Sequence, residues 1–161
     1  MRYFKLMKSY PFQVFRHRVY LPLFNLLGVL GDFRRGVTTS KIIELNELGL
    51  NPDVGARCET VSYRKLHQAF KVAKSYGFNK FCDIGCGLER AVLVADEVGF
   101  NELYAVDISP ELISMAKDNL KKRKVSAVLS CSDVDDFLIP GGRLVVYLFN
   151  PFGKERMTLL I

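Results

Sequence analysis

The sequence is 161 residues long, 49% of its residues are hydrophobic, and its formal net charge is +6. This length and apolar content exclude a disordered chain and suffice for one globular domain with its own core. The 23 basic residues exceed the 17 acidic ones too little to single out a nucleic acid or an anionic surface as the partner.

The N-terminal third predicts a basic, amphipathic helix pair. Phe12, Phe15 and Val19 recur at helical spacing around a basic cluster, and residues 21–30 are strongly apolar. These ten residues compare with the roughly 20 that cross a bilayer, and no small-x-small cleavage site follows, so we expect neither a transmembrane helix nor a signal peptide. We expect a cytoplasmic protein whose N-terminal helices pack over the core, with weak membrane-surface contact as the alternative.

Glycines and prolines punctuate residues 32–52, which predicts a linker or flap. We therefore divide the chain into an N-terminal helical extension at residues 1–57 and a core domain at residues 58–161. The core begins with a predicted helix that ends before Gly77, whose apolar residues follow steps of three and four: Tyr63, Leu66, Phe70 and Ala73. This stripe favours a core position for Tyr63.

A strand predicted at residues 79–83 runs into Gly85 and Gly87. Glycines at the end of a buried strand let the backbone turn tightly and approach a ligand closely. A helix rich in apolar residues is expected at residues 88–98, with Gly99 as its C′ glycine. This strand, turn and helix together predict a nucleotide-binding edge.

The next strand ends at Asp107, 24 residues after Asp83. A carboxylate there can accept two hydrogen bonds from a ribose diol, which favours an adenosine ligand. A dinucleotide is the rival, but its fingerprint needs Gly-x-Gly-x-x-Gly so that a pyrophosphate can sit on the helix N-terminus. Arg90 occupies the last position of that fingerprint, which disfavours a dinucleotide.

Further elements complete the predicted order. A helix starts near Ser109 and Pro110 and ends in the basic run at residues 121–124, where cations favour the helix dipole. A third strand ends in residues 130–133, and residues 144–149 form a continuous apolar run, typical of a parallel strand buried on both faces. The sequence therefore predicts an α/β protein.

The order Asp-Ile-Gly-Cys-Gly at residues 83–87, with the acid ending the strand, resembles the donor-binding loop of class I S-adenosylmethionine-dependent methyltransferases. The resemblance covers residues 58–153 and implies a Rossmann-like, doubly wound, mainly parallel sheet that binds S-adenosylmethionine and no metal. It implies that Asp107 contacts the ribose and Asp133 the adenine amine, with Ile108 also at the donor. The methionine end would lie at Asp83, Gly85, Cys86 and Gly87.

Residues 150–153, Asn-Pro-Phe-Gly, are similar to the Asn/Asp-Pro-Pro-Tyr/Phe loop of methyltransferases that act on nitrogen atoms. Asn150 can accept hydrogen bonds from an amine, Pro151 rigidifies the turn, and Phe152 can pack on a planar or cationic substrate. These three are therefore the candidate catalytic residues. The resemblance implies methyl transfer to nitrogen, with a protein amine ahead of RNA or a small amine as the acceptor.

The segment before the core also resembles a group of uncharacterised bacterial methyltransferase-domain proteins. Those relatives tend to carry a Glu-x-x-x-Tyr stretch, which Glu59 and Tyr63 match. This resemblance makes Glu59 a candidate residue of the donor pocket or of a substrate gate. The same role for Tyr63 competes with its place in the core stripe.

Two features depart from the family pattern. Glu89 stands where many relatives have a third glycine, and its side chain could crowd the donor. Only eleven residues follow Asn150, whereas the family core has seven strands, so we expect the last strands to be lacking and residues 144–149 to form an apolar edge. The alternative function is therefore a catalytically inactive or truncated methyltransferase-fold binding module.

The cysteines and histidines predict no metal site. The sequence contains no Cys-x-x-Cys pair, so we expect reduced, buried thiols at Cys58, Cys82, Cys86 and Cys131. His17 and His67 lie far apart in the sequence and have no metalloprotease or triad signature around them. We expect both histidines to be packing or surface residues.

Overall fold

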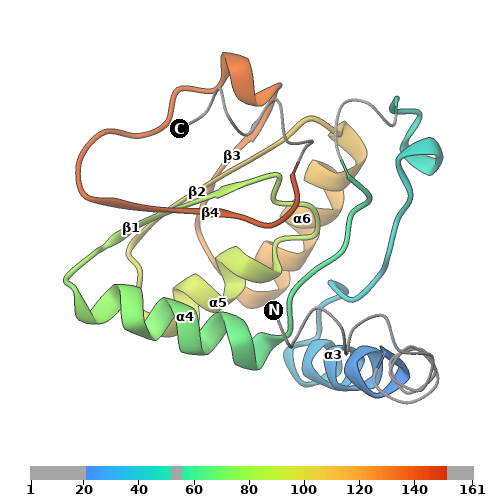
Figure 1. Ribbon diagram of the computed structural model, residues 1–161, viewed down its shortest axis with the longest axis horizontal. Coiled ribbons are helices and arrows are strands. Elements are labelled where there is room, and N and C mark those ends of the chain that lie inside the picture. The colour runs from blue at the N-terminus through green and yellow to red at the C-terminus, as the bar shows by residue number, and fades with distance from the viewer. Residues whose placement is uncertain (1–20, 52–55, 152–161) are drawn as a thin grey trace, which may run out of the picture.

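The computed structural model describes residues 21–51 and 56–151, with side chains from residue 26 onward (Figure 1). Its sheet is parallel and has the strand order β3-β2-β1-β4, where β1 is Lys80–Ile84, β2 is Glu102–Asp107, β3 is Val128–Cys131 and β4 is Leu144–Leu148. The strand order reverses at β1, which pairs with β2 on one side and β4 on the other. Open α/β sheets bind ligands at such a point, outside the carboxyl ends of the strands. The predicted Rossmann-like fold is confirmed.

Helices α4 (Tyr63–Ser75), α5 (Arg90–Val98) and α6 (Pro110–Arg123) cover one face of the sheet (Figure 1). Aromatic rings form the centre of this layer, where the Phe70 and Phe81 ring centroids lie 4.7 Å apart in an edge-on arrangement. Tyr63, Leu66 and Phe70 are buried on the inner side of α4, which confirms the predicted stripe. Packing against this helical layer keeps β1 in place and thereby positions the loop that follows the strand.

The other face of the sheet has a thinner cover. Cys82, Ile84 and Val106 form a small buried cluster there, packed against the 3-10 helix η4 (Val134–Asp136) and its flanking loop. Because no described α-helix covers this face, β4 is half-buried, and Val146 is 38% exposed. The expectation that this strand is buried on both faces was wrong. Within the described residues β4 pairs only with β1, so it lies at the edge of the sheet as expected.

The segment before the core differs from its prediction. Helix α3 (Leu21–Arg35) extends five residues beyond the apolar run, so the expected linker at 32–52 begins inside a helix. A 3-10 helix, η2 (Leu45–Leu48), and an isolated antiparallel bridge between Ile43 and Cys58 structure the remainder. The boundary after residue 57 stays a prediction, and the predicted helix around Phe12 and Phe15, with His17, lies outside the described residues. Among those residues, no helix has the length and apolar character required to span a membrane.

Candidate functional site

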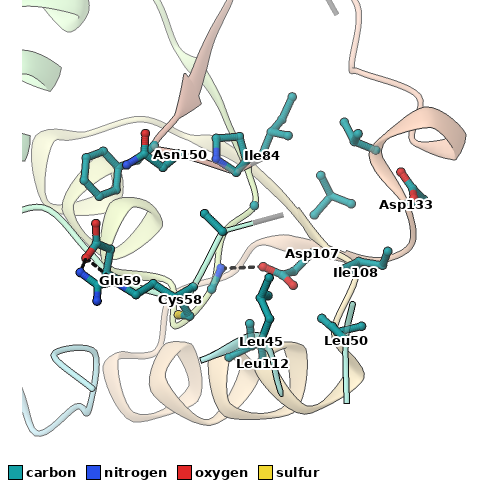
Figure 2. A pocket seen from close by; sticks show the side chains of 18 of the residues that line it. Leu45, Leu50, Cys58, Glu59, Ile84, Asp107, Ile108, Leu112, Asp133 and Asn150 are labelled. Carbon is teal, nitrogen blue, oxygen red and sulfur yellow. Dashed lines mark hydrogen bonds and ion pairs between the residues drawn. The ribbon is translucent and has the colours of Figure 1, made fainter. Parts of the chain in front are cut away.

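A cavity opens at the carboxyl ends of the strands, where the fold predicts a ligand (Figure 2). About 730 Å³ of space lies between its walls, open solvent at its mouth included, and it is the larger of two adjoining cavities. Its wall combines the turn after β1, the end of β2, the turn after β3, the end of β4 and the segment around η2. Six of the predicted donor residues line it: Glu59, Gly85, Gly87, Asp107, Ile108 and Asp133. Asn150 and Pro151 from the predicted acceptor loop line the same cavity.

The turn after β1 is held by hydrogen bonds to the neighbouring strand. The amides of Gly85 and Cys86 both donate to the carbonyl oxygen of Val106, at 2.9 and 3.1 Å. Gly85 has φ +75°, and a Cβ atom added to it would lie 2.6 Å from the Cβ of Pro151. Glycine is therefore required at this position, both for the backbone conformation and for the close approach of the acceptor loop.

Asp107 is the acid that projects into the larger cavity from the end of β2 (Figure 2). Its two carboxylate oxygens accept hydrogen bonds from the backbone amides of Gly87, at 2.9 Å, and Ser109, at 3.0 Å. Burial raises the pKa of Asp107, and hydrogen bonds from these amides partly offset that rise. A carboxylate has about four lone-pair sites, so Asp107 retains acceptor capacity for a ligand beyond its hydrogen bonds to the backbone.

Asp83 and Cys86 do not line the larger cavity. Both line a smaller neighbouring cavity, together with Glu59 and Gly85. Asp83 is buried at the end of β1, and burial followed by the charge of Asp107 raises its pKa. Burial likewise raises the pKa of the Cys86 thiol, which makes it a poor nucleophile. The predicted donor loop therefore faces two adjoining cavities rather than one.

Glu89 occupies the position of the family's third glycine and delays the start of α5 to Arg90, two residues later than expected. It adopts a left-handed conformation with φ +69°, which an L-residue with a side chain rarely takes. The side chain is fully buried, and neither carboxylate oxygen has a nitrogen or oxygen partner among the described residues. Glu89 lines neither cavity, so it does not fill the space predicted for the donor.

Arg90 ties the N-terminal segment to the start of α5. Its guanidinium donates to the Thr39 hydroxyl at 2.7 Å, to the Ser40 hydroxyl at 2.5 Å and to the carboxylate of Asp32 at 3.2 Å. The ring of Tyr63 lies beneath it, 4.4 Å from the guanidinium carbon to the ring centroid. This confirms that Tyr63 is a core residue. Neither Asp32 nor Arg90 was predicted as part of such a network.

Several residues that line the larger cavity escaped the sequence analysis. Leu45, Leu50 and Cys58 lie on the segment that wraps over the cavity, and Leu112 lies on α6 beneath it (Figure 2). Scattered leucines in a glycine- and proline-rich stretch give no periodic signal, so only the fold reveals their shared wall. They add apolar side chains to the wall that also contains the carboxylates of Asp107 and Asp133.

The arrangement fits an adenosine-containing ligand. Asp107 offers free acceptor positions, as a ribose diol requires, and Asp133 at the start of η4 is a carboxylate within reach of a base in the same cavity. The apolar wall of Leu45, Leu50 and Leu112 suits the flat faces of a base and the sugar. The fourth-strand turn brings Asn150, with φ +48°, to the mouth, while Phe152 lies outside the described residues.

The cysteines and His67 behave mostly as expected. The described residues contain free thiols at all four cysteine positions, but only Cys82 and Cys86 are buried, while Cys58 is half-buried and Cys131 is exposed. His67 forms an ion pair with Glu97 at 2.8 Å on the outer side of the helical layer. No group of three or more metal-ligating side chains occurs in the part of the chain that the structure describes.

Comparison with known proteins agrees with this geometry. Residues 82–143 match the family model described as methyltransferase domain. Ribosomal protein L11 methyltransferases of Thermotoga neapolitana and Thermotoga petrophila are 30% and 29% identical to this chain over 56 residues, 35% of this chain and 21% of each relative. The chain thus spans about a fifth of the length of these curated relatives.

Among solved structures, a proposed RNA methyltransferase from Pyrococcus horikoshii is similar with a TM-score of 0.50 and 24% identity, covering 60% of this chain and 53% of that one. An S-adenosylmethionine-dependent methyltransferase from Clostridium acetobutylicum has a TM-score of 0.45 and 23% identity, covering 53% and 37%. The first likeness shows the fold.

Proposed function

We propose that this chain, whose residues 82–143 match a methyltransferase-domain family model, is a class I S-adenosylmethionine-dependent methyltransferase that binds S-adenosylmethionine in the larger cavity and directs its methyl group to a nitrogen acceptor. One observation carries the proposal. A single cavity is lined by the predicted ribose and adenine acids, Asp107 and Asp133, by the glycines of the turn after β1, and by Asn150. These residues are separated by up to 65 positions in the sequence and converge only in this fold.

Each residue then has a defined task in binding. Asp107 is already oriented by two backbone amides, so its remaining acceptor positions meet the ribose hydroxyls without further ordering. Asp133 accepts from the adenine amine, and Asp83, with Gly85, Cys86 and Gly87, holds the methionine end. Bound S-adenosylmethionine supplies a sulfonium-activated methyl group, so the protein's part is to align the nucleophile with it.

Asn150 and Pro151 are the proposed acceptor side of the cavity, with Phe152. The Asn150 side-chain amide oxygen can accept from an amine N–H and thereby orient the nitrogen lone pair. A protein amine is the acceptor class we favour over RNA or a small amine, and the L11 methyltransferase names of the curated relatives support it. The free thiols of the described residues support a reducing, cytoplasmic location.

A binding module without catalysis is the second candidate, and Glu89 is the observation that favours it. A buried, unpaired carboxylate in a left-handed conformation strains the turn between the glycines and α5. A module of this kind would act through partner contacts and would be indifferent to Asn150→Ala.

Calorimetric titration with S-adenosylmethionine tests the proposal. We expect saturable binding by the full chain, and a loss of affinity of about 100-fold or more in Asp107→Ala, which removes two hydrogen bonds to a charged acceptor. Asp118→Ala, an exposed acid on α6, is the matched control and leaves affinity unchanged. A folded chain that does not bind the donor contradicts the proposal.

Transfer is tested separately with radiolabelled donor and a panel of protein, RNA and small-amine acceptors. Asn150→Ala is expected to lower the transfer rate while donor affinity persists. Donor binding without transfer to any acceptor class, and without an effect of Asn150→Ala, supports the binding module instead.

A further inference from the structure

Helix α3 contacts the domain through its small and polar side. Gly28 and Asp32 are buried, and a Cβ atom on Gly31 would lie 2.5 Å from the ring of Tyr63. Arg35, one turn later, forms a bidentate pair with Glu97 of α5 at 2.6 and 2.8 Å. The side of α3 that faces the domain therefore holds glycines, an acid and an arginine, with no large apolar residue among those described.

The opposite side of α3 is apolar and exposed. At 100° per residue its large apolar side chains fall within an arc of roughly 160°. Their exposed fractions are 54% for Leu26, 58% for Leu27, 53% for Val29, 44% for Leu30 and 83% for Phe33. A surface helix normally turns its apolar stripe toward the core, so the amphipathicity of α3 is inverted. Contiguous exposed apolar side chains of this kind mark an interaction surface.

Charge identifies the kind of partner. Residues 1–31 contain no Asp or Glu, but five basic residues: Arg2, Lys5, Lys8, Arg16 and Arg18. The acid that α3 does contain, Asp32, is buried toward the domain, whereas Arg34 is exposed beside Phe33. The described residues of α3 therefore combine an exposed apolar stripe with the exposed Arg34 and no exposed acid, and the sequence before them adds only basic charge. Apolar side chains together with positive charge are the combination that binds anionic lipid headgroups.

A second copy of the chain fits this surface less well. In a symmetric dimer each surface patch meets its own equivalent, so the exposed Arg34 side chains of the two copies would lie at the same interface, where their like charges repel. An anionic bilayer instead attracts the basic residues and takes up the apolar side chains without a protein partner.

We propose that α3 lies flat on an anionic lipid bilayer and anchors the domain there through Leu26, Leu27, Leu30 and Phe33. None of the α3 residues lines either cavity, so docking leaves the site walls uncovered. The proposal does not depend on the proposed methyl transfer.

Co-sedimentation of the full chain with vesicles tests it. Vesicles of phosphatidylcholine with about one third phosphatidylserine are compared with pure phosphatidylcholine, at low and high salt. We expect binding only to the anionic vesicles, weakened by salt. The triple variant Leu27→Ser, Leu30→Ser, Phe33→Ser should bind more than tenfold less tightly, because three apolar side chains no longer enter the interface.

Two further variants complete the test. The control is a second triple variant, Val72→Ser, Val128→Ser, Leu138→Ser. It removes apolar side chains outside α3 that are 59%, 58% and 90% exposed, and it should bind vesicles like the wild type. Arg34→Ala should weaken binding about fivefold through charge alone. Circular dichroism melting shows that each variant is folded.

Three results overturn the proposal. One is equal sedimentation with neutral and anionic vesicles, and another is an equal loss in the two triple variants. The third is a wild-type dimer in sedimentation velocity that the α3 triple variant alone converts to a monomer, which would assign the surface to a second copy.

Discussion

Asp32 and Glu89 are both buried acids, but only Asp32 has a complete set of hydrogen-bond partners. The comparison shows what such a network contributes to this protein. Asp32 accepts hydrogen bonds from the amides of Thr39 and Ser40, the hydroxyls of Thr39 and Tyr63, and the guanidinium of Arg90. Glu89 precedes Arg90 in the chain, yet the guanidinium turns away from it toward Asp32. Apart from the weakly donating thiol of Cys86, Glu89 has no hydrogen-bond partner among the described residues.

The two environments shift the acids in opposite directions. Burial raises the pKa of Asp32, but hydrogen bonds from Thr39 and Tyr63 and the charge of Arg90 outweigh it, so the net pKa is lowered. Burial and the charge of Asp83 raise the pKa of Glu89 well above its ordinary value. A complete network thus keeps one acid ionised and holds α3 on the domain, while the acids beside the cavity repel one another.

Removal of Asp32 should have the largest effect. Asp32→Ala leaves Arg90 buried without its counter-charge, which costs about 3–5 kcal/mol of unfolding free energy. Urea unfolding measures the loss, and Asp118→Ala on the exposed side of α6 should change stability by less than about 0.5 kcal/mol. Equal losses of unfolding free energy in the two variants would show that the hydrogen bonds of Asp32 stabilise the fold no more than an exposed acid does.

The titration of Glu89 should be visible in the pH dependence of the unfolding free energy. Its folded pKa is raised, so its favourable contribution is complete below the unfolded pKa of about 4.3 and is lost as pH rises through the folded pKa. In that window the unfolding free energy falls by up to about 1.4 kcal/mol per pH unit and per group. Glu89→Gln cannot titrate, so its stability should decline less steeply when urea unfolding is followed from about pH 5 to about pH 8. Parallel profiles contradict this role.

Asp32 affects the acid side of the pH dependence of stability, where the unfolding free energy falls as the pH is lowered. Its lowered pKa means that its contribution is present above the unfolded value of about 3.9 and disappears as pH falls through the folded pKa. The loss of stability at acid pH should therefore be shallower in Asp32→Ala than in the wild type, with Glu97 supplying part of what remains, and it should be retained in Glu89→Gln.

Glu89→Gly should raise stability by about 1 kcal/mol at neutral pH. Glycine adopts φ +69° without strain and removes a buried carboxyl group whose hydrogen-bond partner is only the Cys86 thiol, and together these gains exceed the packing lost with two methylene groups. Thermal unfolding of Glu89→Gly beside Glu89→Ala separates the causes, since alanine removes the carboxyl group but keeps the backbone strain. A glycine variant less stable than the alanine variant is the contrary result.

Ser40→Ala should have the smallest effect, a loss of about 0.5 kcal/mol of unfolding free energy, because it removes one of several hydrogen bonds to Arg90. Ser75→Ala removes an exposed hydroxyl that donates to the Val72 carbonyl and is the matched control. A similar shift in both urea midpoints would mean that Arg90 gains nothing from the Ser40 hydroxyl.

Local signals explain what the sequence could predict. Each strand end, the C′ glycine at Gly99 and the cap at Ser109 depend on neighbouring residues, and the structure places all of them within two residues of expectation. The cap is specific, since the Ser109 hydroxyl accepts from the amide of Leu112 at 3.2 Å. Motif order also predicted which acids meet at one edge, although their roles in donor binding stay predictions.

Long-range contacts explain the rest. Asp32 and Arg90 are 58 residues apart, and an acid in a presumed linker carries no sign of its partner. The wall formed by Leu45 and Leu50 and the inverted face of α3 likewise depend on which side of a segment meets the domain. The split of Asp83 and Asp107 between two cavities could not be predicted, because sequence spacing gives the strand ends but not the direction of each side chain.

The close approach of Gly85 and Pro151 limits the distance between the donor side and the acceptor side of the cavity. A Cβ atom on residue 85 would lie 2.6 Å from the Cβ and 3.2 Å from the Cα of Pro151, so the turn after β1 and the turn after β4 lie too close together for a side chain at position 85. In the proposed function, Gly85 lies on the donor side and Pro151 on the acceptor side, so their approach sets the distance between the methyl group and its acceptor. Even the single methyl group of alanine at position 85 would push the two reactants apart, whatever it did to the affinity for either one.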